Sequence, residues 1–423
     1  FVSIDCGVED DYFDNSTGIW FKSDTEFISS GENHDTLPEY FLNNDKEQFG
    51  KRYETVRSFP NGMKNCYTLK LEQAKNNSFR IRASFAYGNY DHKNKIPKFD
   101  LYLGVNYWAT VNLPNFQGFF YEIIHVFPAD TEYVCLANTG TGTPFISALE
   151  IRPSNISTYG NGSSLELLNI RLYDLSSDPG QSPGVSIFWN RYKDDIYDRV
   201  WFPYQPPRSV PINTSLDIDT QGSGSLYKLP VEVLRTAVRP FNGSNSLNYS
   251  SSFASSYEYN LYFHFAELEY FEDKQREISI TVNGITQGPF TLEYLKPLSI
   301  SFQRLRTVEG NITFTISTTM ESGLPPILNA LEYYVLEQFT DSATDPSDEV
   351  VNNTIASNKE GFLKSKNQPF TYSEIVTITA NFETGIGEGG FGKVFRGHLN
   401  DGTPVAVKLL SSSSKQGYKE FQA

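Results

Sequence analysis

The chain is poor in several residues on which common functions depend. Its three cysteines are too few for a disulfide-dense scaffold, and their odd number leaves at least one unpaired. The sequence does not choose the pair. Its five histidines show no metal-ligand spacing, and neither Cys-x-x-Cys nor Gly-x-Ser-x-Gly occurs. No run of about 18 apolar residues is present, so no membrane-spanning helix is predicted. We therefore expect no metal site and no serine-hydrolase site.

Basic residues are scarce in the first part of the chain. Residues 1–350 carry 27 Lys/Arg and 44 Asp/Glu, a balance of −17, whereas residues 351–423 have a balance of +2. Because contacts to nucleic-acid phosphates need clustered Lys/Arg, this acidity argues against a nucleic-acid partner. Basic or neutral partners fit better.

Two local groups of acidic residues raise the question of glycosidase chemistry, which uses paired carboxylates. They are Asp194, Asp195 and Asp198 in one place and Glu267 and Glu269 in another. Charge clusters are usually solvated, so we expect both groups on the surface. His264 lies on the polar alternation of its segment, so we expect it at the surface or at a sheet edge.

The chain is rich in N-glycosylation sequons, Asn-x-Ser/Thr without proline in the middle. Eight lie before residue 320 and one more begins at Asn352, after which none occurs. This distribution predicts a secreted or lumenal N-terminal region. The eight candidate glycosylation sites are Asn15, Asn76, Asn155, Asn161, Asn213, Asn242, Asn248 and Asn311.

The first 336 residues contain an internal duplication. The segments 19–21, 79–85 and 146–150 recur as 200–202, 259–265 and 328–332, with offsets of 181, 180 and 182 residues. Three anchors at nearly constant offset indicate two copies of one domain type. We place the copies at residues 1–175 and 176–338.

Each copy has the pattern of antiparallel β-strands. Residues 79–85, 99–105, 278–282 and 312–316 alternate apolar and polar side chains, as half-buried strands do. Asn283-Gly284 is a strong signal for a two-residue hairpin. We therefore predict a mainly β protein built from two β-sandwiches.

The repeats are followed by a different kind of sequence. Residues 339–369 are polar and lack apolar periodicity, so we predict a flexible linker. Helix signals return with Thr371-x-x-Glu374, a capping-box spacing, and with Ile375, Ile378 and Phe382 on one helix face. Residues 387–394 then match Gly-x-Gly-x-x-Gly-x-Val, and a Val-Ala-Val-Lys segment ends at Lys408.

Together these features resemble a plant receptor-like kinase. The pair of sandwiches, opening with Phe1-Val2-Ser3-Ile4-Asp5-Cys6-Gly7, resembles the tandem malectin-like ectodomain of the leucine-rich-repeat subclass. Residues 370–423 are similar to the start of the kinase domain, its N-lobe. The resemblance implies ATP as cofactor, with Mg²⁺ only in a complete kinase. The residues implied to bind ATP are Ile386, Gly387, Glu388, Gly389, Gly390, Phe391, Gly392, Lys393, Val394, Ala406 and Lys408.

The departures from that family pattern are as informative as the match. Leucine-rich repeats, a membrane span, the catalytic loop and the metal-binding Asp-Phe-Gly are not found in this sequence. We therefore expect no phosphoryl transfer from the chain as given and at best weak ATP binding. One hypothesis is a truncated or mis-spliced receptor Ser/Thr kinase. The alternative is a non-catalytic secreted binding protein with a vestigial kinase segment.

The family resemblance also sets expectations for location and partners. It implies the plasma membrane, whereas the chain as given would be secreted or lumenal. The implied partners are an extracellular ligand, either a cell-wall carbohydrate or a peptide, and a co-receptor. Aromatic residues could stack on sugars, but we expect most of them in the core or in cross-strand pairs. The aromatic residues in question are Tyr87, Tyr90, Tyr102, Tyr107, Trp108, Tyr257, Tyr259, Tyr262 and Tyr270.

Overall fold

The computed structural model divides the chain into two compact units, Phe1–Asn352 and Asn353–Ala423. Each unit is described by itself. The predicted linker, apart from Phe339, lies outside the described residues, as do Asn155, Asn161 and Asn352. The structure describes residues 1–15, 17–41, 50–116, 118–154, 156–159, 165–175, 190–191, 195–220, 225–320, 322–339, 375, 378–380, 382–389, 392–398 and 404–410.

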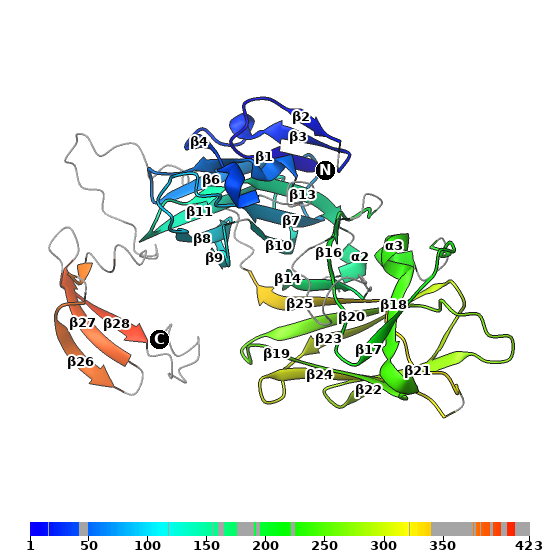
Figure 1. Ribbon diagram of the computed structural model, residues 1–423. Coiled ribbons are helices and arrows are strands. Elements are labelled where there is room, and N and C mark those ends of the chain that lie inside the picture. The colour runs from blue at the N-terminus through cyan, green and yellow to red at the C-terminus, as the bar shows by residue number, and fades with distance from the viewer. Residues whose placement is uncertain are drawn as a thin grey trace. The chain divides into compact units, whose positions relative to one another are not determined.

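The first copy is a sandwich of two sheets (Figure 1). Both contribute to one core of buried apolar side chains, which confirms the predicted β-sandwich. The first sheet has the order β2 (Tyr12–Asp14), β3 (Ile19–Ser23), β1 (Val2–Asp5), β13 (Ala148–Ser154), β7 (Ser78–Phe85) and β10 (Phe119–Val126). The second has the order β6 (Lys64–Lys70), β11 (Thr131–Thr141), β8 (Lys98–Leu103) and β9 (Asn106–Val111).

The second copy repeats this arrangement around a second core. Its first sheet contains β16 (Val200–Pro203), β14 (Leu165–Asp174), β25 (Ala330–Gln338), β20 (Glu258–Ala266) and β23 (Pro297–Leu305). Its second sheet has the order β19 (Ser246–Ser252), β24 (Asn311–Thr318), β21 (Arg276–Val282) and β22 (Ile285–Leu292).

Strand pairing shows which residues of the two copies are equivalent. In the first copy Asp5 of β1 pairs with Ala148, and in the second Asp174 of β14 pairs with Ala330. β1 also pairs in parallel with β3, and β14 pairs in the same way with β16. β14 is therefore the strand of the second copy that is equivalent to β1, although it lies before residue 176, where the predicted second copy begins. The predicted boundary between 175 and 176 stays a prediction.

One predicted anchor of the duplication is shifted by a residue. The parallel pairing joins Asp5 to Ser23 and Asp174 to Pro203, which aligns Phe21 rather than Trp20 with Trp201. A one-residue slip in a strand turns every side chain to the opposite face. The side chain of Trp20 is accordingly 66% exposed, whereas Trp201 is buried.

The first sheets of the two copies are continuous. Ile123 and Ile124 of β10 pair with Leu168 and Leu167 of β14 in the antiparallel sense. Hydrogen-bonded strands thus run from β2 at the far edge of the first copy to β23 in the second (Figure 1). The two copies are held by shared backbone pairing as well as by side chains.

Short elements complete the first unit. They are the 3-10 turns Asp24–Glu26, Pro38–Phe41, Lys51–Tyr53, Ser225–Tyr227 and Phe241–Gly243, the helices α2 (Ile156–Tyr159) and α3 (Val231–Leu234), and the strands β4 (Glu32–Asp35), β5 (Thr55–Ser58), β12 (Phe145–Ile146), β15 (Asn190–Arg191), β17 (Ser209–Asn213) and β18 (Thr236–Pro240).

The local strand predictions hold in the outer sheets. In β21 and β24 buried apolar residues alternate with polar residues that are half-buried or exposed. This is the pattern expected when one face of a strand is buried. The predicted hairpin joins β21 to β22, with Val282 opposite Ile285. Asn283 and Gly284 both have positive φ, 46° and 83°, as a type I′ turn requires.

The prediction of half-buried strands is wrong for β7, in the central sheet. Its polar residues Arg80, Arg82 and Ser84 are buried together with the apolar ones. Residues of the second copy contact Arg80 and Arg82, which explains why the polar face of β7 is shielded from solvent. β20, the equivalent strand, is likewise buried along almost its whole length.

The structure selects one disulfide where the sequence left the pairing open. Cys66 and Cys135 are bonded across β6 and β11, where they are directly opposite. Cys6 is a free thiol in the core, and burial raises its pKa. At the equivalent register position of the second copy, Thr315 donates a hydrogen bond of 2.8 Å to Asn248. A covalent cross-link in one copy therefore corresponds to a hydrogen bond in the other.

The second unit contains an antiparallel sheet of β26 (Gly385–Gly389), β27 (Gly392–His398) and β28 (Pro404–Leu410). Ile378 lies so close to Gly397 that a Cβ there would be 2.6 Å from its side chain, and Phe382 packs edge-on against Phe395. The segment 378–382 therefore covers the sheet face that contains Phe395 and Gly397. The capping-box residues Thr371 and Glu374 lie outside the described residues.

In the described part of the chain, no helix has both the length and the apolar character that a membrane span needs.

Candidate functional site

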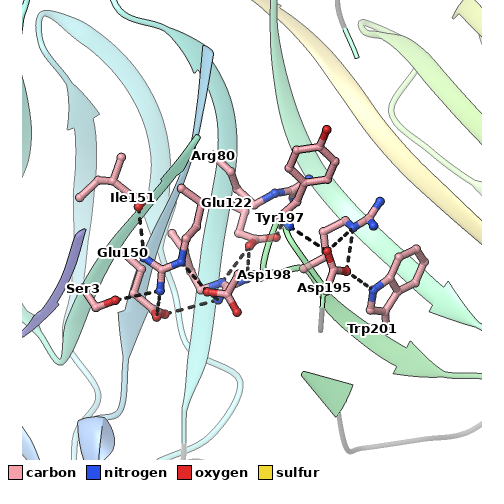
Figure 2. Close-up of polar contacts among 12 residues, drawn as sticks. Ser3, Arg80, Glu122, Glu150, Ile151, Asp195, Tyr197, Asp198 and Trp201 are labelled. Atoms are coloured by element: carbon pink, nitrogen blue, oxygen red, sulfur yellow. Dashed lines mark hydrogen bonds and ion pairs between the residues drawn. The ribbon is translucent and has the colours of Figure 1, made fainter. Parts of the chain in front are cut away.

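A group of buried charges lies where the two copies meet. Arg82 of β7 bonds Glu122 of β10 at 2.8 Å, and Arg152 of β13 bonds Asp198, just before β16, at 2.6 Å. Arg152 also bonds Glu150 at 2.9 Å. All five side chains are at least nine-tenths buried. Figure 2 shows this group around Glu122, Glu150 and Asp198.

A second charge group adjoins the first and is centred on Arg199. Its guanidinium bonds Asp195 at 2.9 Å and the Tyr159 hydroxyl at 2.9 Å, and it is 3.4 Å from Glu332. Trp201 donates its ring N–H to Asp195 at 3.1 Å, as Figure 2 shows. Arg199 and Trp201 are fully buried. Asp195, in the turn before β16, is thus held by both Arg199 and Trp201.

Glu332 of β25 is the acceptor at the centre of the second group. It accepts hydrogen bonds from Tyr159, His264 and Tyr334 at 2.7–3.1 Å. Burial opposes its ionisation, but the bond from His264 and the charge of Arg199 outweigh burial and lower the Glu332 pKa to about 2. Burial lowers the pKa of His264, which is therefore a neutral donor.

Contacts between the copies are part of this network. Arg80 of the first copy bonds the hydroxyl of Tyr334 at 3.1 Å, and Arg82 donates to the carbonyl oxygen of Asp198. Charges taken out of water are tolerated only with close, well-aligned partners. Each acid named in this network meets an arginine or a hydrogen-bond donor, so the two copies are held in one orientation. We call this contact between the copies, formed by the two charge groups, the joint.

The structure corrects the predictions made for these acids and for His264. Asp195, Asp198 and Glu267 are buried rather than solvated, and each is paired with an arginine. His264 is buried rather than at the surface. Asp194 lies outside the described residues. Arginines at alternate positions of central strands were the available signal, but this alternation also fits a strand face exposed to solvent.

Most of the aromatic residues considered for sugar stacking belong to the core, as expected. Tyr87, Tyr90, Trp108, Tyr259 and Tyr262 are buried. Those that remain exposed are Tyr107 at 51%, Tyr257 at 40% and Tyr270 at 70%, while Tyr102 is half-buried.

The described sequons are accessible. Five of their asparagines are exposed and Asn311 is half-buried. Glycan attachment is therefore sterically open at the five exposed sites, which are Asn15, Asn76, Asn213, Asn242 and Asn248.

The residues expected to bind ATP belong to the sheet of the second unit. Ile386, Gly387, Glu388 and Gly389 are on β26, and Gly392, Lys393 and Val394 on β27. Ala406 and Lys408 are on β28, while Gly390 and Phe391 lie outside the described residues. Gly387, Val394 and Lys408 form one row across the three strands, and Arg396 pairs with Ala406.

The joint gives stability a pH dependence through His264, which faces Glu332, Arg199 and Tyr227. Its pKa is lower folded than unfolded, so below about pH 6.5 the unfolded state binds a proton that the folded state does not. We expect the H264Q variant to gain stability relative to wild type between pH 7 and pH 5, by at most about 1.4 kcal/mol per pH unit. Urea unfolding at each pH measures the difference.

Asp5 supplies a control of opposite sign. Burial raises its pKa to about 7, against hydrogen bonds from Tyr12 and Thr55 and the charges of Arg52 and Lys51. The folded state therefore holds a proton between about pH 4 and pH 7, and this contribution is lost as pH rises. The D5N variant should lose stability relative to wild type as pH falls over that range. Differences that stay constant with pH in both variants would contradict both assignments.

Comparison with known proteins identifies the family to which the fold belongs. The malectin-like domain model matches residues 4–336. A probable leucine-rich-repeat receptor-like serine/threonine-protein kinase of Arabidopsis thaliana is 39% identical over 351 residues, 79% of this chain and 37% of that protein. A putative leucine-rich-repeat receptor-like protein kinase of the same plant is 37% identical over 356 residues, with 82% and 39% covered. The chain thus spans about two fifths of the length of the curated relatives it matches.

Solved structures agree with this fold. The ANXUR1 extracellular domain of Arabidopsis thaliana aligns with a TM-score of 0.61 and 15% identity over 79% of this chain and 96% of that chain. A chain in the crystal structure of the plant peptide RALF23 in complex with FER and LLG2 aligns with a TM-score of 0.60 and 16% identity, with 79% and 95% covered. Identities this low establish the fold alone. With the match over residues 4–336, the chain belongs to the malectin-like domain family, and the curated relatives it matches are plant receptor-like kinases.

Proposed function

We propose that residues 1–339 are the extracellular ligand-binding region of a receptor-like kinase and that the ligand is a basic peptide. The observation that carries this proposal is the buried joint. Two malectin-like sandwiches share one sheet, and a network of paired buried charges fixes their orientation. A rigid pair of domains offers a preformed surface, so little conformational freedom is lost when a ligand binds.

An extracellular location is supported by covalent chemistry. The Cys66–Cys135 disulfide suits an oxidising compartment, because thiols in the cytosol are kept reduced. The five exposed sequon asparagines are accessible to glycosylation in the secretory route. A co-receptor that contacts the same region is part of the proposal.

The charge of the region favours a peptide with basic residues. The balance of −17 over residues 1–350 attracts cations and speeds their association. One aligned solved structure is described as a complex with a plant peptide, RALF23. Sugar binding has less support, because most of the aromatic side chains considered for stacking are buried.

A direct binding experiment tests the ligand class. The full chain, made by secretory expression, is immobilised and exposed to an alternating Arg/Val octapeptide, its Glu/Val counterpart and cellohexaose. We expect binding of the Arg/Val peptide alone, with affinity falling at least about tenfold between about 50 and about 500 mM salt. Binding of cellohexaose with neither peptide bound would reject a peptide ligand.

We also propose a nucleotide-phosphate site on the sheet of the second unit. Glycine lets backbone amides approach phosphate oxygens, and Gly387, Val394 and Lys408 form one row across the sheet. Segment 378–382 packs on the opposite face, and Ala406 is exposed. Backbone amides of Gly387, Gly389 and Gly392 and the Lys408 ammonium would hold ATP, which in a complete kinase supplies the transferred phosphoryl group.

Nucleotide binding is tested with a fluorescent ATP analogue added to the full chain. We expect weak binding that K408A reduces by at least about tenfold, because a phosphate contact loses its charge. The matched control is K75A, at an exposed lysine of the first unit, which should leave binding unchanged. Equal affinity of the K408A variant and wild type would contradict the proposed site.

A further inference from the structure

Two large aromatic side chains lie together on the surface of the first copy. Phe13 of β2 and Trp20 of β3 are directly opposite, with ring centroids 5.6 Å apart. Phe13 is 44% exposed and Trp20 is 66% exposed. β2 is the last strand of its sheet (Figure 1). Two adjacent exposed aromatic rings offer an apolar surface that a ligand can cover.

The aromatic pair sits on an ordered base. Tyr12 stacks on Phe21 at 5.5 Å beneath the hairpin, and its hydroxyl donates to Asp5 at 2.6 Å. The ammonium of Lys51 lies 3.9 Å from the Tyr12 ring. These contacts hold β2 and β3 in place, so Phe13 and Trp20 present a fixed surface.

The turn of the same hairpin carries a sequon at a distinctive spacing. Asn15 is exposed, two residues after Phe13, and Thr17 supplies the sequon hydroxyl. The turn is closed by the Gly18 amide, which donates to the Asp14 carbonyl at 2.7 Å, and by Thr17, which donates to the Asp14 carboxylate at 2.7 Å. A sugar on Asn15 would therefore emerge beside the aromatic pair.

The other described sequons lack this arrangement. Two residues before Asn76, Asn213, Asn242, Asn248 and Asn311 stand Ala, Pro, Pro, Ser and Glu. Asn161 has Tyr159 at this spacing, but that ring is buried within the joint. In the described part of the chain, Asn15 is thus the sequon with an exposed aromatic residue two positions earlier.

We propose that the first N-acetylglucosamine of a glycan on Asn15 stacks on Phe13 and Trp20 and covers this apolar surface. Apolar C–H faces of a sugar ring match the faces of aromatic rings, and aromatic contacts of this size are favourable. The inference rests on the extracellular location proposed above. It assigns a glycan-binding role to Phe13 and Trp20.

The modification itself needs a glycan donor of the secretory route, an oligosaccharide linked through C1 to a lipid pyrophosphate. The Asn15 side-chain nitrogen bonds to C1 of the first sugar and loses a proton, while the C1–oxygen bond breaks and the lipid pyrophosphate leaves. No oxidant or reductant takes part. The product is a neutral amide-linked sugar.

The test is a thermal-unfolding cycle on the full chain produced with high-mannose glycans. Removing the glycan by N15Q should lower the Tm by about 2–4 °C in the wild-type background. In the F13A/W20A background the same substitution should change the Tm by less than about 1 °C. The matched control N213Q removes an exposed sequon without an aromatic neighbour, and it should leave the Tm unchanged.

Enzymatic trimming separates the first sugar from the rest of the glycan. Endoglycosidase H leaves one N-acetylglucosamine on each asparagine, so the Tm should stay at the wild-type value while N15Q still lowers it. Equal N15Q losses in both backgrounds would overturn the proposal, as would Asn15 unmodified while the other exposed sequons carry glycans. Complete absence of glycans from every sequon would instead reject the extracellular location as well.

Discussion

The E332A substitution should reduce the free energy of unfolding by about 3–5 kcal/mol, the largest effect that we expect from a single residue. Glu332 accepts bonds from Tyr159, His264 and Tyr334 and faces Arg199. Without the carboxylate, two buried hydroxyls and the His264 ring lose their acceptor, and their desolvation is uncompensated. Arg199 loses one of its two carboxylate partners and keeps Asp195. Urea unfolding followed by circular dichroism measures the loss.

Two further variants interpret that result. E332Q keeps hydrogen-bond acceptors but removes the charge, so its loss should lie between those of wild type and E332A. E293A breaks an ion pair with Lys296 in which both side chains are more than half exposed, and it should leave stability unchanged. A loss for E332A no larger than that for E293A would show that the joint contributes nothing to stability.

Removing the disulfide should have a similarly large effect. The C66A/C135A variant opens a cross-link between residues 69 apart in sequence. A cross-link that closes a loop of this length strongly restricts the unfolded chain. We therefore expect its removal to reduce the free energy of unfolding by about 4 kcal/mol. Urea unfolding with and without a reductant gives the measurement, because the reductant should destabilise wild type and leave the variant unaffected.

The third cysteine provides the control for this experiment. Cys6 is buried and unbonded, so C6A should keep the full sensitivity to reductant. Stability of wild type that does not change on complete reduction would contradict the expected contribution of the cross-link. The second copy has a Thr315–Asn248 hydrogen bond at the equivalent position, so reductant has no bond to break there.

The fold of the outer sheets was predictable from local sequence. The hairpin at Asn283-Gly284 and the alternation of β21 and β24 are confirmed because one sheet face meets the core and the other meets water. The duplication was predictable as well, since equivalent strands repeat at nearly constant spacing. One predicted anchor was wrong by one residue, because Phe21 rather than Trp20 is equivalent to the buried Trp201. Trp20 therefore lies on the opposite, exposed face of its strand.

The joint between the copies was not predictable in the same way. Arg80 and Arg82 alternate with apolar residues, as they would in a strand with one solvent-exposed face. They are buried only because the second copy packs on that face. Arg80 meets Tyr334, 254 residues away, and Arg152 meets Asp198 across the two copies. No local pattern encodes partners at such separations.

By itself, the sequence determined the β class, the duplication, the acidic balance of the first unit and the positions of the sequons. Only the tertiary structure decided which charges are buried, which cysteines are bonded and which aromatic rings remain exposed. The physical reason is that alternation within a strand records one face against another, whereas burial depends on what packs against each face. In this protein the two copies cover each other's polar faces, and pairing compensates the charges that this contact buries.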